Sequence, residues 1–427
     1  MHADGWAANH TGHTRQNNED SLLCEPQMGL YVVADGMGGH AAGEIASSAA
    51  VDVVRRCILS AQPLIQSLTR ESADKDWEML LRVVEDAVQD ACRSIFEMAA
   101  ADATRKGMGT TLTLLLTVGD RGLMAHVGDS RLYLSRGGQI YQLSEDHTFV
   151  WQMLQKGKMT PEEARVSPFS HLLTRAIGLQ PQVEVDLLTF DLIPGDTFLL
   201  CSDGLHDYVA EPVEDLLPFL ESNDARTLPD RMVEWALAQG GNDNVTAIVV
   251  RVLGEQAPRH REVTLQFTTL QATALLRYIT YEEMLRVLNV IEVVEVETGQ
   301  LVVEDGSEGR ELFIILTGQV EVVKEGKVLR ELGPGAHFGE MALVDQSPRS
   351  ATVRAAGPCR LMVLSQEGLY SLMRHEPRVA NKILWGIVEV LSTRLRENSN
   401  ALAGLMIRND ALFRQFEVTL HEIATER

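Results

Sequence analysis

The sequence predicts an α+β protein with two dissimilar parts. In the first part, up to residue 252, short apolar runs bounded by glycine turns alternate with longer runs whose apolar residues recur every three to four positions. These patterns are typical of strands and helices, respectively. In the second part, short strands recur between frequent glycines, which indicates a small barrel or jelly roll. We therefore expect antiparallel sheets covered by helices, followed by a small β-domain with C-terminal helices.

In the first part, strands are predicted at 30–34, 110–117, 123–127, 131–134, 183–190, 197–201 and 245–252. Helices are predicted at 43–59 and 77–103, where apolar residues follow the helical period. Two of the strands form a hairpin-like pair, 131–135 and 139–143, around Arg136-Gly137-Gly138. Such pairs favour antiparallel sheets, with helices on their faces.

The polar segment 253–267 contains Gly254 and Pro258 and is predicted to be a linker. The second part begins with a short helix at 280–288 and continues with short strands between 291 and 364. Helices are then predicted at 366–374 and 376–396, and the tail is compatible with a further helix. The predicted domains are therefore 1–252 and 268–397, joined by the linker and followed by a helical tail, 398–427.

Composition excludes several classes of protein. A net charge of −22 and a pI near 5.0 argue against nucleic-acid binding. The five cysteines are scattered without paired spacing, which is typical of a reduced, cytoplasmic protein. The N-terminus shows no signal-peptide pattern, and no apolar run approaches the roughly 18 residues that a membrane helix needs. We expect no membrane association.

Four acidic motifs indicate a metal site for phosphoester chemistry. They are Arg15–Asp20, Ala34–His40, Gly128–Arg131, and Ser202–Gly204 with Asn242–Asn244. Each places a carboxylate where a predicted strand ends or a turn begins. Carboxylates that converge at one sheet edge repel one another unless hard cations such as Mg²⁺ or Mn²⁺ neutralise them. Taken singly, each motif could equally be a turn or a helix cap.

Together, these motifs resemble those of the PPM family, the metal-dependent serine/threonine protein phosphatases, in the form typical of its bacterial branch. The resemblance covers about residues 4–252 and implies a sandwich of two antiparallel sheets flanked by helices. It also implies two Mn²⁺ or Mg²⁺ ions, with a weaker third site. The implied roles are metal ligands for Glu19, Asp35, the Gly36 carbonyl, Asp129, Asp203 and Asp243, and phosphate binding for Arg15.

One position departs from the family pattern. Many eukaryotic relatives carry histidine directly after the Asp-Gly pair as a proposed general acid, whereas Met37 stands there in this chain. The proton donor for the leaving group is therefore open. His40 more readily opens the next helix than acts in catalysis, and His147 and His206 are expected to be structural or exposed. Residues 156–175 match the variable flap beside the family's site.

A second motif lies at Phe338–Leu343, followed by Pro348–Thr352. Small residues at Gly339 and Ala342 let a short helix bring its backbone N–H groups close to a phosphate. Arg349 would supply the cation for a singly charged cyclic phosphate. Glu340 can accept a hydrogen bond from a ribose 2′-hydroxyl. Ser350 can add a hydroxyl near the phosphate or the purine.

This stretch resembles the phosphate-binding cassette of cyclic-nucleotide-binding domains, over about residues 268–397. The resemblance implies a jelly roll that binds cyclic AMP or cyclic GMP, and we favour cyclic AMP. The alternative is a sensory jelly roll that has lost its ligand. The C-terminal helices could pack on the barrel, cover the purine as a lid, or pair with a second copy in a homodimer.

The combined prediction is a cytoplasmic phosphatase acting on phosphoserine and phosphothreonine in a phosphoprotein substrate through a metal-activated water. Cyclic nucleotide is predicted to regulate it, with activation favoured over inhibition. The rival hypothesis is a catalytically silent pseudophosphatase, an adaptor that signals nucleotide binding to a partner. The presence of all the expected carboxylates argues against this rival.

Overall fold

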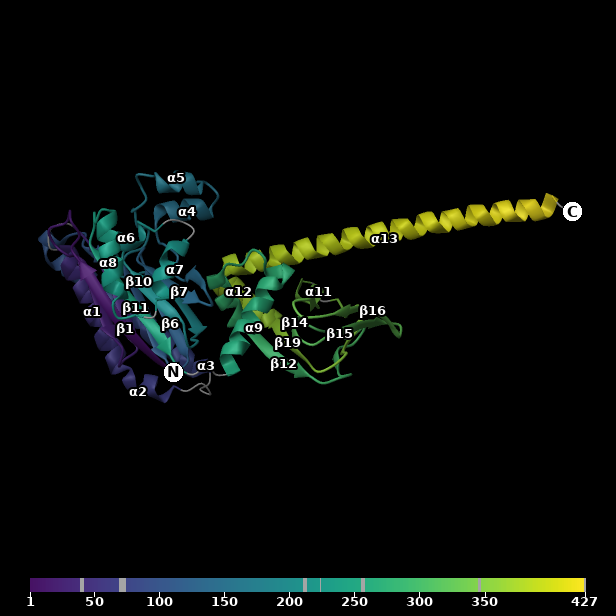
Figure 1. Cartoon of the computed structure of the whole chain (residues 1–427), viewed down its shortest axis with the longest axis horizontal. Coiled ribbons are helices and arrows are strands. Elements are labelled where there is room, and N and C mark those ends of the chain that lie inside the picture. Colours follow the sequence, from purple (N-terminus) through teal and green to yellow (C-terminus); the bar gives the residue numbers. More distant parts are fainter. Residues whose placement is uncertain are drawn as a thin grey trace. The chain divides into compact units, whose positions relative to one another are not determined.

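The computed structural model describes residues 1–38, 42–68, 74–209, 213–222, 224–254, 258–344 and 347–425. His40 therefore lies outside the described residues. The chain divides into two compact units, Met1–Val263 and Thr264–Arg427 (Figure 1). Among the described residues, none of the helices has both the length and the apolar character needed to cross a bilayer.

The first unit contains two antiparallel sheets. One has the order β1-β11-β10-β7-β8, and the other has the order β2-β3-β5-β6-β9, with β4 paired to β3. The strands are β1 (His2–His10), β2 (Asp20–Glu25), β3 (Leu30–Met37), β4 (Gly109–Thr110), β5 (Leu112–Val118), β6 (Arg121–Val127), β7 (Arg131–Arg136), β8 (Gln139–Gln142), β9 (Asp186–Asp191), β10 (Thr197–Cys201) and β11 (Val245–Leu253).

Helices cover the outer faces of this sandwich. Apolar residues of β3, β5 and β6 form one core with α1 (Ala42–Ser60) and α3 (Asp74–Ala101). Residues of β10 and β11 form another core with α8 (Leu228–Gln239). The shorter helices are α2 (Gln62–Ser67), α4 (Phe149–Gln155), α5 (Pro161–Arg165), α6 (Asp203–His206), α7 (Leu217–Leu220), η1 (Ala103–Arg105) and η2 (Val213–Leu216).

The inner faces of the two sheets meet in a tight interior. The Phe190 ring of β9 lies 5.6 Å from the Phe198 ring of β10, which belongs to the other sheet. The Tyr31 hydroxyl of β3 donates to the Ala3 carbonyl of β1 over 2.9 Å. A Cβ on Gly5 would lie 2.3 Å from the Tyr31 ring, so only glycine admits this ring. The predicted sandwich flanked by helices is confirmed.

Some predicted elements differ from the structure. Strand 183–190 begins only at Asp186, and β1 and β2 were not predicted. β1 carries Gly5 and two asparagine or aspartate positions, which are rare in strands. Its pairing partner is β11, where His2 lies opposite Leu253. β1 and β11 are more than 230 residues apart in the sequence, so their pairing produces no pattern within β1 that could predict the strand.

The second unit is built on two four-stranded sheets with the orders β12-β19-β14-β17 and β13-β18-β15-β16. Its strands are β12 (Ile291–Val296), β13 (Leu301–Val303), β14 (Glu311–Thr317), β15 (Val320–Lys324), β16 (Lys327–Leu332), β17 (His337–Phe338), β18 (Thr352–Ala355) and β19 (Cys359–Ser365). Apolar residues from both sheets, among them Phe313, Phe338 and Val353, share one core. This arrangement agrees with the predicted small jelly roll.

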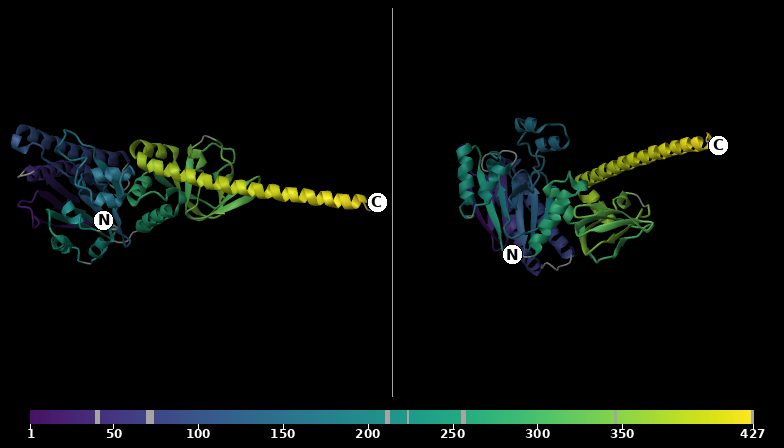
Figure 2. Two further views of the ribbon diagram at one scale, coloured as in Figure 1. Left: turned by 90° about the horizontal axis from the view of Figure 1, so that it is seen from above. Right: turned by 45° about the vertical axis from the view of Figure 1, so that its right-hand side comes forward.

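Helices pack on the outer face of the β12-β19-β14-β17 sheet, where Ile314 and Met362 form a core with Ile383 and Ile387. The helices are α9 (Pro258–Ala272), η3 (Ala274–Leu276), α10 (Tyr281–Leu288), α11 (Met341–Val344), α12 (Gln366–His375) and α13 (Pro377–Thr425). In both views of Figure 2, α13 runs as one helix past the strands of its own unit.

Two predicted boundaries require correction. Helix α9 starts at Pro258, inside the segment predicted to be a linker, because proline is favoured in the first turn of a helix. The predicted division at residues 397 and 398 falls within α13, which continues to Thr425. The polar run Glu397–Asn400 lies inside this helix, because serine and asparagine weaken a helix without breaking it.

Candidate functional site

Four predicted metal carboxylates come from neighbouring strand ends of the two sheets. Asp35 lies near the end of β3, and Asp129 follows β6 by two residues. Asp203 opens α6 directly after β10, with Ser202 as the helix cap. Asp243 precedes β11. The structure therefore brings these motifs together at one end of the sandwich, as their positions at strand ends predicted.

The carboxylates raise one another's pKa values. Burial, followed by the charges of Asp203, Asp20 and Asp129, raises the pKa of Asp35 well above its usual range. Burial and Asp203 do the same to the pKa of Asp129. Burial and Asp243 raise the pKa of Asp203, whose Oδ1 is buried without a hydrogen-bond partner among the described residues. These carboxylate oxygens, one of them without a hydrogen-bond partner among the described residues, are the ligands that hard divalent cations prefer.

Asp20 also belongs to this cluster, although it was not predicted as a site residue. It lies opposite Asp35 in the β2–β3 pair. Its Oδ2 accepts hydrogen bonds from Ser202 Oγ over 2.8 Å and from Thr246 Oγ1 over 2.7 Å. Burial raises its pKa to about 7. Asp20 therefore ties the end of β10 and the start of β11 to β2, and so positions the two segments that carry Asp203 and Asp243.

Arg15, the predicted phosphate ligand, pairs with a predicted metal ligand. Its Nη2 donates to Asp243 Oδ2 over 2.6 Å, and this hydrogen bond raises the pKa of Arg15. The other carboxylate oxygen, Asp243 Oδ1, accepts from the backbone N–H of Asn244 over 2.8 Å. Both side chains of the pair are partly exposed, so Arg15 can exchange Asp243 for another anion at the surface.

Glu19 and Gly36 lie side by side, as their predicted shared role requires. The Gly36 N–H donates to the Glu19 carbonyl over 3.1 Å, and the Glu19 N–H donates to Asn244 Oδ1 over 2.8 Å. A Cβ on Gly36 would lie 2.2 Å from the Gly43 carbonyl oxygen. The structure therefore leaves no room for a side chain at Gly36. Burial raises the pKa of Glu19, and Arg15 opposes this rise.

The predicted flap, 156–175, begins directly after α4, contains α5, and contributes a histidine to the acidic cluster. His171 Nδ1 lies 3.9 Å from Oδ2 of Asp203 and 3.9 Å from Oδ2 of Asp207. One ligand atom from each of the three residues falls within 4.8 Å of the others, a spacing that could hold a cation. Neither His171 nor Asp207 was predicted, because a lone flap histidine carries no pattern in a single sequence.

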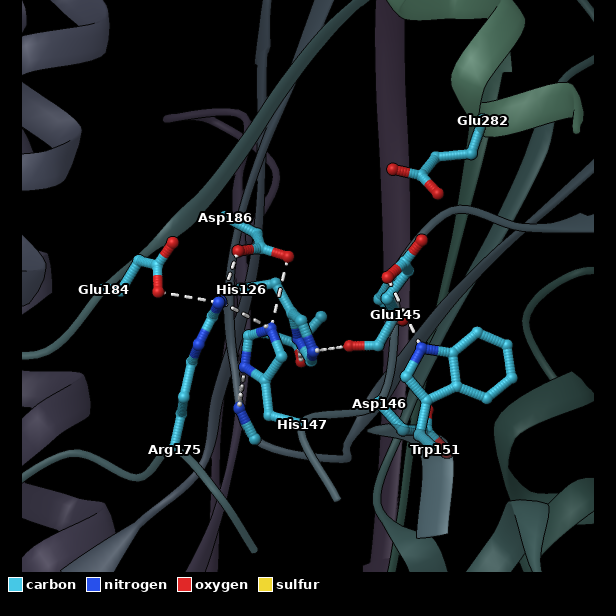
Figure 3. A network of polar contacts seen from close by, with 12 residues as sticks. His126, Glu145, Asp146, His147, Trp151, Arg175, Glu184, Asp186 and Glu282 are labelled. Atoms are coloured by element: carbon cyan, nitrogen blue, oxygen red, sulfur yellow. Dashed lines mark hydrogen bonds and ion pairs between the residues drawn. The ribbon is translucent and has the colours of Figure 1, made fainter. Parts of the chain in front are cut away.

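His147 joins the end of the flap to the turn that precedes Asp129, and Figure 3 shows its ring beside Arg175 and Asp186. Its Nδ1 accepts from the Gly128 N–H over 3.1 Å, and its Nε2 lies 3.2 Å from Asp186 Oδ2. Arg175, at the end of the flap, donates to Asp186 Oδ1 over 2.7 Å. His147 is buried and holds the flap exit in place, so its role here is structural, as predicted.

His206 holds the backbone beside the acidic cluster. Its Nε2 lies 2.9 Å from the Asp129 carbonyl oxygen. Burial lowers the pKa of His206 to about 3, so the ring is neutral near neutral pH. A neutral, buried ring of this kind positions Asp129, in agreement with the predicted structural role.

The second predicted site forms a cavity of about 400 Å³ in the second unit. All five predicted cassette residues line it: Gly339, Glu340, Ala342, Arg349 and Ser350. Gly339 has a positive φ of 83°, and a Cβ there would lie 2.6 Å from both Arg349 Nη1 and the Glu311 carbonyl oxygen. Only glycine lets the chain pass so close to the arginine.

Arg349 is buried and anchored by β14. Its Nη2 donates to Glu311 Oε2 over 2.9 Å, and its Nη1 donates to the Glu311 carbonyl over 3.1 Å. The guanidinium carbon lies 5.7 Å from the centre of the Phe313 ring. Its Nε is buried without a hydrogen-bond partner among the described residues. With both terminal nitrogens bound to Glu311, the Arg349 guanidinium still has its Nε–H to donate to an acceptor such as a phosphate oxygen.

Glu340 contacts an arginine that the sequence did not single out. Arg394 of α13 donates its Nη1 to Glu340 Oε1. Glu340 is 2% exposed, and its Oε2 has no hydrogen-bond partner among the described residues. Arg394 also lines the cavity, together with Glu397 and Asn398 of the same helix. Nothing in the local sequence marks these three positions, because α13 brings them to the pocket from 54 or more residues beyond Glu340.

Comparisons with known families match both units. Residues 9–239 match the family model for protein phosphatase 2C. Residues 293–376 match the model for the cyclic nucleotide-binding domain. The first match covers more than half of the chain, and it spans the segments that carry all six predicted metal ligands except Asp243, which lies just beyond it.

Individual relatives match the first unit. The serine/threonine protein phosphatase PstP of Mycobacterium tuberculosis is 38% identical over 242 residues, 57% of this chain but 43% of that protein. The chain thus spans less than half the length of this relative. The serine/threonine phosphatase stp of Listeria welshimeri is 34% identical over 243 residues, 56% of this chain and 92% of that protein.

Solved structures match the same region. A crystal structure of the Mycobacterium tuberculosis phosphatase PstP/Ppp is similar, with a TM-score of 0.52 and 35% identity; the match covers 60% of this chain and all of that one. The PstP catalytic domain in complex with two manganese ions is similar, with a TM-score of 0.51 and 35% identity, over 59% of this chain and 99% of that one.

Proposed function

Because the chain belongs to the protein phosphatase 2C family, we propose that it is a metal-dependent phosphatase acting on phosphoserine and phosphothreonine in proteins. The observation that carries the proposal is the cluster of buried carboxylates whose pKa values rise through burial and mutual repulsion. Such a cluster favours binding of divalent cations. The two manganese ions in the related PstP catalytic domain support this choice of metal.

In this proposal, Asp35, Asp203 and Asp243 hold two Mn²⁺ or Mg²⁺ ions, with Glu19 and the Gly36 carbonyl beside one of them. When bound, such ions supply an activated water nucleophile and stabilise the negative charge that develops on the phosphate. Asp129 with Asp203 is proposed to hold a weaker third ion, and His171 and Asp207 offer further ligand atoms beside Asp203. This third ion would bind in addition to the two ions of the main site.

Arg15 is proposed to bind the substrate phosphate. Its guanidinium presents two donors in one plane, which matches a pair of phosphate oxygens. The carboxylate of Asp243 holds the guanidinium at the rim of the acidic cluster. An arriving phosphate would take the place of Asp243 as the acceptor, and Asp243 would then be available to a cation. Arg15 therefore orients the phosphate and neutralises part of its charge.

The test is hydrolysis of a phosphoserine peptide and of an aryl phosphate by the full chain, with Mn²⁺, with Mg²⁺ and with excess chelator. We expect turnover with either metal and none with the chelator. Full activity in chelator contradicts the metal mechanism. A folded protein that binds Mn²⁺ but hydrolyses neither substrate favours the pseudophosphatase adaptor instead.

We propose further that the second unit binds a cyclic nucleotide, with cyclic AMP as the first candidate and cyclic GMP as the comparison. Two buried atoms of residues that line the cavity have no hydrogen-bond partner among the described residues, and they support the proposal. Arg349 Nε is a free donor that suits a phosphate oxygen, and Glu340 Oε2 is a free acceptor that suits a hydroxyl. Calorimetric titration with each nucleotide tests this, and absence of binding for both contradicts it.

Bound nucleotide is proposed to regulate phosphatase activity, with activation favoured over inhibition. A ligand shifts a conformational equilibrium only by its difference in affinity for the two states. Couplings of about 1–3 kcal/mol are typical and correspond to roughly 5- to 150-fold. The measurement is the rate of phosphopeptide hydrolysis with and without saturating nucleotide. Equal rates, despite proven binding, contradict direct regulation.

Two further assignments remain proposals. We propose the cytoplasm as the location, because all five cysteines are free, as is typical of reducing compartments. We also propose a homodimer through α13. Leu395, Leu402 and Leu405 of this helix are each at least 60% exposed, and apolar residues on a helix normally find a partner. Light scattering at several concentrations tests the dimer.

A further inference from the structure

The nucleotide pocket contains a buried carboxylate that is only half satisfied. Arg394 Nη1 donates to Glu340 Oε1, and Arg394 Nη2 also lies 3.5 Å from the His337 carbonyl oxygen. Glu340 Oε2 is buried and has no hydrogen-bond partner among the described residues. The two oxygens of one carboxylate therefore differ: one is held by α13 and the other remains available as an acceptor.

This arrangement specifies what the missing partner must be. An ionised carboxylate accepts hydrogen bonds and donates none, so Glu340 Oε2 requires a donor. A buried acceptor without a donor costs free energy, which a ligand hydroxyl can recover. The guanidinium of Arg394 has a planar set of donors, so it fixes the orientation of the carboxylate that it holds.

We propose that Arg394 is a positioning residue of the nucleotide pocket. It holds Glu340 by one oxygen and thereby presents the other oxygen to the 2′-hydroxyl of a cyclic nucleotide. The inference rests on the proposed nucleotide binding and adds a residue of α13 to the site. The ribose, Glu340 and Arg394 then form one chain of hydrogen bonds, which links the occupied pocket to α13.

A different role for Arg394 predicts the opposite result. If the ribose must displace Arg394 from Glu340, removing the arginine strengthens nucleotide binding. If Arg394 positions Glu340, removing it weakens binding, and the loss depends on the 2′-hydroxyl. A nucleotide without this hydroxyl gains nothing from a well-oriented Glu340 and is therefore insensitive to the substitution.

The experiment measures the affinities of cyclic AMP and 2′-deoxy cyclic AMP for the full chain by competition with a fluorescent cyclic nucleotide. The variants are Arg394→Ala, Arg394→Lys and, as a matched control, Arg396→Ala, which alters an exposed arginine on the same helix. For Arg394→Ala we expect about a tenfold loss for cyclic AMP, the size of one charge-assisted hydrogen bond, and less than about a twofold change for the deoxy analogue.

Arg394→Lys should restore part of the lost affinity, because it keeps the charge and loses the planar fork. Arg396→Ala should match the parent with both nucleotides. An equal loss for both nucleotides, or tighter binding of cyclic AMP, overturns the positioning role. If the parent binds neither nucleotide, the proposed nucleotide binding itself fails. Thermal midpoints of all variants, measured in parallel, separate these outcomes from loss of the folded state.

Discussion

Replacing Arg15 with alanine should separate phosphate binding from metal binding. Arg15 Nη2 and Asp243 Oδ2 are 2.6 Å apart, and the two side chains are 53% and 34% exposed. Ion pairs this exposed to solvent contribute about 0–1 kcal/mol to stability. The variant should therefore fold normally. Because Asp243 loses a competing partner, its affinity for Mn²⁺ should stay the same or rise.

Catalysis should respond differently from metal binding. A hydrogen bond between a guanidinium and a phosphate contributes about 1.5–3 kcal/mol. Its loss in Arg15→Ala should lower kcat/KM by roughly 10- to 150-fold. The assay combines initial rates on a phosphopeptide with calorimetric titration of Mn²⁺. Arg15→Lys should recover part of the activity, because lysine keeps the charge without the planar fork.

A matched control comes from the same unit. Arg55 Nε lies 2.6 Å from Glu25 Oε1, with side chains 41% and 26% exposed, on α1 and β2. Arg55→Ala removes an ion pair of the same length and similar exposure and should leave kcat/KM unchanged. The reasoning is refuted if Arg15→Ala loses Mn²⁺ affinity in step with activity, or if it is as active as Arg55→Ala.

Three further outcomes are expected. Asp35→Asn should abolish turnover while the thermal midpoint changes little, because a neutral amide removes one of the mutually repelling charges; retained turnover in a rate assay counts against the metal role. In excess chelator, Asp20→Asn should gain stability over the parent as pH rises from about 4 to about 7, by at most about 4 kcal/mol. The folded parent keeps Asp20 protonated up to about pH 7, whereas the unfolded chain loses this proton near pH 4, so the parent loses stability across that range. Urea unfolding at several pH values measures this, and a pH-independent difference contradicts it. Arg349→Ala should remove most cyclic-nucleotide affinity in calorimetry, whereas Arg354→Ala, which breaks an exposed pair with Glu321, should not.

The sequence predicted residues whose role follows from a local pattern. Asp35, Asp129 and Asp203 stand beside glycines at strand ends, and both the strands and the turns have local signals. Asp20 was missed because its importance comes from Ser202 and Thr246, which reach it from about 180 and 230 positions away. The spacing of apolar and polar residues along the chain does not reveal hydrogen bonds between residues so far apart in the sequence.

The same limit applies to the nucleotide pocket. Gly339, Glu340 and Arg349 lie in one short stretch, so their joint role could be predicted. Arg394 lies inside the predicted helix 376–396, but no local pattern shows that this helix passes the pocket. The continuity of this helix depends on backbone hydrogen bonds and on its packing over Val379–Ile387, and single-residue helix propensities do not capture either.

The uninterrupted course of α13 gives the pocket a lever arm. Arg394 lies within the helix, and the helix continues to Thr425, a span of about 47 Å at 1.5 Å per residue. A stiff rod converts a small rotation at one point into a large displacement at its far end. A tilt of roughly 5° at Arg394 would move the end of the helix sideways by about 4 Å. Sub-ångström adjustments around a bound ribose can therefore be amplified mechanically along a single element.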